Sequence, residues 1–161
     1  MQANITQILS QSRLMAGVPF EIMESLAGRF GEMRDVPAGE VFKKSSDEAD
    51  AAFLVRSGNV QVSESGGLSN EVYAYTVGQG EILGALALLD SVETGAEYRA
   101  AEDTTLAALP RPVFNEWLTG YPEYREALLA NTELDRQYHF LRRTQLFNEL
   151  NAIDLYALAR E

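Results

Sequence analysis

The sequence predicts an α+β fold, in which an antiparallel β-roll, or jelly-roll-like barrel, of short strands is flanked by helices. Apolar residues recur at helical spacing near both ends of the chain. Between about residues 35 and 109, short β-rich segments alternate with glycine-containing turns about every 8–12 residues. Hydrophobic residues make up 46% of the 161 residues, which is enough for a packed core.

The first 30 residues are expected to form two short helices. Their apolar side chains recur three and four positions apart until Gly17 and Pro19 interrupt the pattern. Because proline suits a first helical turn, the second helix is expected to start at Pro19. The periodic residues are Ile5, Ile8, Leu9, Leu14, Ile22, Met23, Leu26 and Phe30.

The central region is expected to contain short strands and one short helix. The run at residues 85–89 is rich in alanine and leucine, which favour helix, so a helix is expected there, inside the barrel. The order of strands, mini-helix and further strands favours a roll over a parallel sheet with crossover helices. The expected strands are residues 41–43, 52–56, 59–63, 72–77, 95–101 and 104–109.

After Pro110 the chain is expected to be helical again. A first helix has an apolar face, and Pro122 is expected to open a longer helix that runs to about Arg143. The apolar stripe of the longer helix is expected to pack against the barrel or against a partner helix, which leaves a homodimer through these helices open. The two apolar sets are Val113, Phe114, Trp117 and Leu118, then Leu128, Leu134, Tyr138 and Leu141.

The last residues repeat the pattern of an earlier segment. Residues 146–160 match residues 14–28 at a constant offset of 132, with Leu146, Leu158 and Ala159 in identical positions. A repeat at domain length predicts one domain at residues 1–143 and the start of a truncated second copy at 144–161. A C-terminal helical extension with a chance similarity between amphipathic helices is the alternative.

Composition excludes several functions. A net charge of −11 would be repelled by phosphate backbones and anionic membrane surfaces, so no nucleic-acid partner is expected. No apolar run approaches the roughly 20 residues of a membrane span, so no membrane insertion is expected. The chain has no cysteine and one histidine, His139, which argues against disulfides, a metal site and thiol catalysis. Together with the lack of a signal-peptide pattern, this predicts a cytoplasmic protein.

Four segments carry a more specific indication. Residues 36–42 read VPAGEVF, residues 50–62 read DAAFLVRSGNVQV, and residues 78–84 read GQGEILG and lead into LALL at 86–89. In this order, they resemble the cyclic-nucleotide-binding domain family from residue 5 to about residue 143. The resemblance implies a β-roll that binds a cyclic nucleotide next to the short helix.

The resemblance also implies a role for the segment that begins at Gly84 and contains the short helix: it corresponds to the family's phosphate-binding cassette, the segment that binds the cyclic phosphate. In the family, amides at the start of the short helix face the cyclic phosphate. A glutamate directly after the glycine accepts a hydrogen bond from the ribose 2′-hydroxyl, and an arginine about nine residues later pairs with the phosphate. The implied ligand site comprises Gly84, Ala85, Leu86, Ala87, Thr94, Gly95, Ala96, Glu97 and Arg99.

Both charged positions of that cassette are changed in this sequence. Gly84 is followed by Ala85 instead of glutamate, Thr94 stands at the arginine position, and Glu97 adds a carboxylate. Since each lost charge-assisted hydrogen bond costs about 1.5–3 kcal/mol, cyclic AMP and cyclic GMP are expected to be weak ligands at best. No other cofactor is expected. Arg99 either reaches an anion in the pocket or forms a surface ion pair with Glu97.

These observations predict a non-catalytic regulatory or sensor module that couples the β-roll to its C-terminal helices in a larger tandem-domain protein. Its expected partners are a cyclic nucleotide or other small anion and further domains of the same parent chain. The alternative is a docking or oligomerisation scaffold that needs no ligand. A small β-barrel enzyme finds no support, because no nucleophile, base and acid stand at catalytic spacing. Within the family, tandem copies accompany kinase regulatory subunits, patatin-like lipases and some bacterial transporters.

Overall fold

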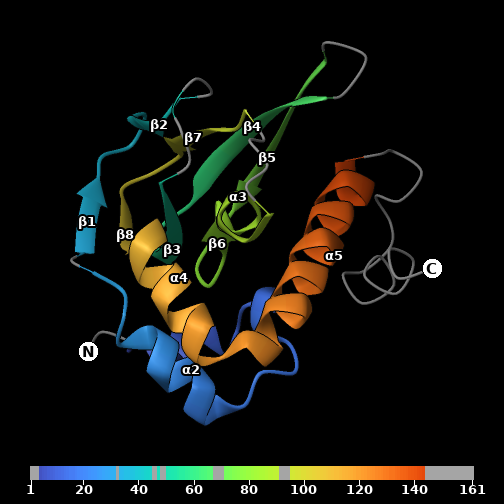
Figure 1. Cartoon of the computed structure of the whole chain (residues 1–161). Coiled ribbons are helices and arrows are strands. Elements are labelled where there is room, and N and C mark those ends of the chain that lie inside the picture. The colour runs from blue at the N-terminus through green and yellow to red at the C-terminus, as the bar shows by residue number, and fades with distance from the viewer. Residues whose placement is uncertain are drawn as a thin grey trace.

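Two four-stranded antiparallel sheets form the centre of the molecule (Figure 1). The computed structural model describes residues 4–31, 33–44, 47, 50–66, 71–90 and 95–143. One sheet has the strand order β1-β8-β3-β6 and the other the order β2-β7-β4-β5. The strands are β1 Met33–Val36, β2 Val41–Lys43, β3 Ala51–Ser57, β4 Val60–Gly66, β5 Glu71–Val77, β6 Ile82–Leu83, β7 Glu97–Ala100 and β8 Thr104–Pro110. The α+β roll predicted from the sequence is confirmed.

The helices before the roll are α1 Ile5–Leu9, η1 Arg13–Met15 and α2 Phe20–Ala27. The side chain of Asn4 caps α1 by accepting a hydrogen bond of 2.8 Å from the backbone N–H of Gln7. Pro19 is the N-cap of α2 and not its first helical residue, because its extended backbone (ψ 149°) has not yet entered the helix. The expected two-helix start is therefore confirmed, with the boundary one residue later.

The helices after the roll are α4 Arg111–Gly120, the short 3₁₀ helix η3 Pro122–Tyr124 and α5 Arg125–Arg143. Helices α2 and α4 lie together at one end of the molecule, where Trp117 Nε1 donates to Ser25 Oγ at 3.2 Å (Figure 1). Along α5, Leu128 and Tyr138 are buried and Leu134 is half-buried. The predicted stripe is confirmed at these three positions.

Two hydrophobic clusters fill the interior, and β3 and β8 contribute to both. Successive side chains of a strand point to opposite faces. Leu54 therefore packs with the helices while Val55 packs inside the roll. We call the first cluster the helical core and the second the roll core. Fully buried members of the helical core include Ile8, Leu9, Leu26, Leu54 and Trp117, and those of the roll core include Val36, Val55, Val60, Val62 and Leu106.

The short helix α3, Ala85–Asp90, forms where the sequence predicts a helix. It packs between β3 and α5, and Leu88 and Leu89 belong to the helical core. The expectation that this helix lies inside the barrel is therefore corrected, since alanine and leucine cover the outside of the roll. The expected strand at 95–101 is shorter, because Gly95 has a positive φ of 65° and pairing begins at Glu97. The predicted second copy at 144–161 lies outside the described residues.

Candidate functional site

The candidate site begins at the turn between β6 and α3. Gly84 occupies this turn with φ +83°, a conformation that favours glycine. A Cβ atom added to Gly84 would lie 3.1 Å from the backbone oxygen of Ala51 and 3.5 Å from the hydroxyl of Tyr98. The glycine thus lets α3 start close to β3 and to the tyrosine of β7.

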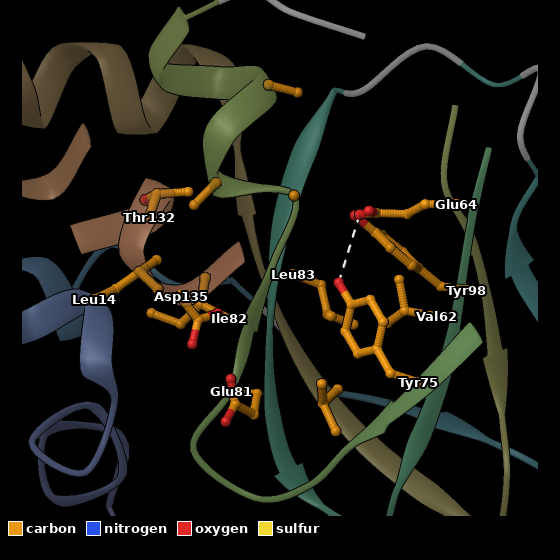
Figure 2. Close-up of a pocket in the computed structure, with 14 residues that line it drawn as sticks. Leu14, Val62, Glu64, Tyr75, Glu81, Ile82, Leu83, Tyr98, Thr132 and Asp135 are labelled. Carbon is orange, nitrogen blue, oxygen red and sulfur yellow. Dashed lines mark hydrogen bonds between the residues drawn. The ribbon is translucent and has the colours of Figure 1, made fainter. Parts of the chain in front are cut away.

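A cavity of about 60 Å³ lies at this turn and extends along both sides of β6. Figure 2 shows Leu83 pointing to one side of the strand and Ile82 to the other. We call these the barrel side and the helix side. The lining residues are Leu14, Val62, Glu64, Tyr75, Val77, Glu81, Ile82, Leu83, Gly84, Ala85, Ala87, Tyr98, Thr132 and Asp135.

On the barrel side, aromatic and aliphatic side chains surround one carboxylate. Glu64 comes from β4 and accepts a hydrogen bond of 3.5 Å from the hydroxyl of Tyr75 on β5 (Figure 2). The ring of Tyr98 contacts Phe42, with 5.8 Å between ring centroids, and Phe53, with 6.5 Å. These ring contacts hold Tyr98 in the barrel, where it takes up space next to Gly84.

On the helix side, a single arginine joins three elements. Arg13 Nη1 lies 3.1 Å from Glu81 Oε1 and 3.3 Å from Asp135 Oδ1, so it pairs with the residue before β6 and with α5. Its guanidinium carbon also lies 4.0 Å from the centre of the Tyr138 ring. We call Arg13, Glu81, Asp135 and Tyr138 the Arg13 cluster. It fixes α5 next to the cavity.

The structure brings together only some of the ligand residues that the resemblance implies. Gly84, Ala85 and Ala87 line the cavity. Ala96 is fully buried in the roll core, and Gly95 leads into it. The side chain of Leu86 and all of Thr94 lie outside the described part of the chain.

Glu97 and Arg99 lie on the other face of β7. Successive side chains of β7 point to opposite faces of the sheet. Tyr98 and Ala100 are buried on one face, so Arg99 points toward solvent on the other. Arg99 Nη2 lies 3.4 Å from Glu97 Oε1, and its Nη1 donates to the backbone oxygen of Gly39 at 3.1 Å. Since both side chains are more than a third exposed (45% and 35%), this is the surface ion pair that the sequence left as one alternative.

Two charged residues near the cassette do not appear in the sequence-based site. Glu64 is the carboxylate of the barrel side. Lys43 on β2 is 8% exposed, and its Nζ donates to the backbone oxygen of Ala96 at 2.8 Å and to that of Lys44 at 3.3 Å. Both precede the cassette by many residues, and only strand pairing brings them to it. The available indication for Glu64 was its place two residues after Val62, on the same face of β4.

Other kinds of site find no counterpart in the described residues. No group of three or more histidine, aspartate or glutamate side chains could hold a metal ion within those ranges. Of the helices that the structure describes, none combines the length and the apolar character needed to cross a membrane.

Comparisons with known proteins place these features in a family context. The family model described as the cyclic nucleotide-binding domain matches residues 33–121, which is more than half of the chain. The chain is also 37% identical over 92 residues to lysophospholipase nte1 of Aspergillus fumigatus. That match covers 56% of this chain but only 6% of the relative, so the chain spans a small part of the curated relatives it matches.

Solved structures share the fold at low sequence identity. The regulatory domain of Toxoplasma gondii PKA, crystallised with cAMP, has a TM-score of 0.64 and 20% identity and covers 97% of this chain and 56% of its own. The regulatory subunit of a cAMP-independent protein kinase A from Trypanosoma cruzi, bound to guanosine, has a TM-score of 0.60 and 22% identity. It covers 71% of this chain and 40% of its own.

Proposed function

Because the chain belongs to the cyclic nucleotide-binding domain family, we propose that it is a non-catalytic regulatory module in which binding of cyclic AMP and cyclic GMP is weak or lost. The observation that carries the proposal is the chemistry of the cavity. Of the described residues that line it, none is a lysine or arginine; Glu64 carries a carboxylate on the barrel side, and Glu81 and Asp135, which pair with Arg13, carry carboxylates on the helix side. An anionic cyclic phosphate is disfavoured beside them.

The cassette itself supports this proposal. Ala85 lines the cavity where the family has a glutamate, so it supplies no acceptor for a ribose hydroxyl. Thr94 stands at the arginine position, and Arg99, the next cation along the chain, pairs with Glu97 and Gly39 on the solvent side. A micromolar dissociation constant corresponds to a binding free energy of about 8 kcal/mol. The loss of two charge-assisted hydrogen bonds removes a large share of that free energy.

The size of the cavity also supports weak or lost binding of cyclic nucleotides. Small-molecule sites typically measure about 300–1,000 Å³, whereas this cavity has a volume of about 60 Å³. A nucleotide would therefore have to displace Tyr98 on the barrel side or move α5, which contributes Thr132 and Asp135. Both movements cost free energy, because Tyr98 packs in an aromatic cluster and Asp135 pairs with Arg13.

Titration calorimetry at neutral pH tests the proposal. We expect dissociation constants above about 100 μM for cyclic AMP and for cyclic GMP, or no detectable heat. The Toxoplasma gondii regulatory domain, which was crystallised with cAMP, serves as the positive control. A low-micromolar dissociation constant for either nucleotide would contradict weak binding.

The length of the curated relatives supports a place within a larger protein. We expect the module to act on further domains of its parent chain through α5, which the Arg13 cluster ties to the residue before β6. The Trypanosoma cruzi neighbour, named as cAMP-independent, shows that proteins of this fold occur without dependence on cAMP.

A docking module that needs no ligand is the second candidate, and the small cavity favours it. The two functions differ in how α5 responds to a ligand. We expect millimolar cyclic nucleotide to change amide exchange in α5 if the module is a weak sensor. Unchanged exchange in α5, with no bound nucleotide, would support the docking module.

A further inference from the structure

Lys43 is the only charged residue among those the structure describes as buried. Lysine is rarely buried unless its charge is paired. The Nζ of Lys43 has two partners, the backbone oxygens of Ala96 and Lys44, and both are neutral. In the described part of the chain, no carboxylate oxygen lies within 4.0 Å of it. The ammonium group is therefore desolvated without a counter-ion from these residues.

Strand pairing places this ammonium group beside the cassette. Lys43 pairs with Tyr98 across β2 and β7, and its Nζ lies 5.5 Å from the centre of the Tyr98 ring. Tyr98 also lines the cavity, and its hydroxyl approaches Gly84. The Nζ contacts Ala96, which follows the altered arginine position by two residues. A movement of the Tyr98 ring would thus expose the ammonium group to the cavity.

The other described cations near the cassette are less suited to bind a ligand in the barrel. Arg99 faces solvent in its pair with Glu97. Arg13 lies on the helix side and already pairs with two carboxylates. Arg125 donates to the backbone oxygen of Leu89, at the far end of α3 from Gly84. Lys43 combines burial, neutral partners and proximity to the barrel side.

We infer that Lys43 is the cation that binds the phosphate of an anionic ligand in this barrel, in place of the arginine that the cassette lacks. The inference rests on the proposed function, because it assigns a ligand contact within the same cavity. A single ammonium group cannot form the two parallel hydrogen bonds of an arginine with a phosphate. Binding through Lys43 is accordingly weak, and the ligand class is a phosphate-bearing nucleotide.

The experiment compares Lys43→Met and Lys43→Arg with Arg99→Met, a matched loss of a neighbouring cation. Cyclic AMP, cyclic GMP and inorganic phosphate are titrated to millimolar concentration and followed by the intrinsic fluorescence and by the 31P signal of the ligand. We expect weak binding of a cyclic nucleotide that falls about tenfold or more in Lys43→Met and is unchanged in Arg99→Met. Lys43→Arg should keep measurable binding. Circular dichroism checks the fold, and Lys43→Gln replaces Lys43→Met if the latter does not fold.

Each outcome decides the inference. Equal binding by the wild type and Lys43→Met would overturn it, as would a loss of binding in Arg99→Met alone. No binding of any probe at millimolar concentration would also overturn it, while the proposed loss of cyclic-nucleotide binding would stand. Low-micromolar binding that disappears in Lys43→Met would support the role of Lys43 and contradict the proposed weakness.

Discussion

Ala85 and Tyr98 limit the cavity at the start of α3, with Ala85 in the helical core and Tyr98 in the roll core. Ala85 is 6% exposed and carries no polar group, and Tyr98 fills space beside Gly84. The backbone around them has the turn and the short helix that the resemblance implies for a cassette, since Gly84 makes the turn and α3 follows directly. A change of side chains, without a change of backbone, is therefore expected to alter the ligand preference.

Restoring the two charged cassette positions tests this expectation. Ala85→Glu with Thr94→Arg should create or strengthen binding of a cyclic nucleotide, because the glutamate accepts from the ribose hydroxyl and the arginine pairs with the phosphate. A fluorescent cyclic nucleotide, titrated at one ionic strength, measures it. Each single substitution is the control and should do little. A folded double variant without any gain would show that the cassette alignment is wrong.

Adding Glu97→Thr to that double variant has a smaller role than the sequence alone indicates. From the sequence, Glu97 is expected to oppose a phosphate by its charge. In the structure, Glu97 pairs with Arg99 and is not among the lining residues of the cavity. We therefore expect the triple variant to gain no more than a few-fold over the double variant in the same titration. A gain of a hundredfold would place the Glu97 carboxylate beside the ligand.

Gly58 is a residue whose substitution should affect stability and not binding. It has φ +91°, and an added Cβ would lie 2.5 Å from Thr104 Oγ1 and 2.6 Å from the backbone oxygen of Asp103. Gly58→Ala should therefore lower the free energy of unfolding by more than about 2 kcal/mol. Gly17→Ala is the matched control, because Gly17 has φ +83° but nothing within 4 Å of its added Cβ. Urea unfolding would contradict the steric argument if both variants lost the same amount.

Residue patterns predict the cassette but not the whole site. Gly84, Ala85 and Ala87 follow from a local motif, and the structure places them at the cavity. Lys43 and Glu64 reach the same region through pairing of β2 with β7 and of β4 with β7, which depends on contacts distant in sequence. The outward direction of Arg99 follows from the strand register, and residue type alone leaves it open.

At the scale of elements, the Arg13 cluster joins η1, the residue before β6, and α5. Its carboxylates belong to segments that are far apart in the chain, so no local pattern indicates the pairing. The side chains of Arg13, Glu81 and Asp135 are 30%, 21% and 13% exposed, which shields the pairs from solvent more than an ordinary surface pair.

Removal of Arg13 should loosen α5. Arg13→Met removes the arginine that Glu81 and Asp135 share, so we expect a loss of about 1–3 kcal/mol in the free energy of unfolding and faster amide exchange in α5. Arg29→Met is the control, because Arg29 pairs with Glu116 at 3.6 Å with side chains 42% and 72% exposed. It should change stability by less than about 0.5 kcal/mol. Equal effects of the two variants would contradict a special role for the cluster.

Most elements were predictable from local features: β-rich residues between turns in β3, the alanine and leucine content of α3, and the apolar face of α4. The strands β1 and β6 were not. Only Val36 of β1 is buried, so the strand lacks an alternating pattern, and its pairing with β8 defines it. β6 consists of two residues, which is too short for any pattern. The helix boundary at Pro19 and the start of β7 depend on backbone conformation, which residue type fixes only within one or two positions.

At the scale of the whole molecule, β3 and β8 connect the helical core with the roll core. Leu54 and Leu109 belong to one core, while Val55 and Leu106 belong to the other. Neither core can separate from the other without breaking the paired strands β3 and β8. We therefore expect the described region to unfold as one cooperative unit.

The fluorescence of Trp117 allows this cooperative unfolding to be measured. It is the only tryptophan of the chain, is 1% exposed and lies in the helical core, so its fluorescence follows that core. Far-UV circular dichroism follows the strands and helices together. Both signals should give the same urea midpoint and the same slope. An earlier midpoint for Trp117 fluorescence would mean that the helical core opens separately.

The two-residue strand β6 has a consequence for how such a module responds to substitution. Ile82 faces the helices and Leu83 faces the barrel, so one thin wall separates the Arg13 cluster from the ligand chemistry. Substitutions on the barrel side leave the ion pairs on the helix side in place. Side-chain changes in the barrel are thus expected to alter or abolish the proposed ligand binding while the Arg13 cluster still holds α5 in place.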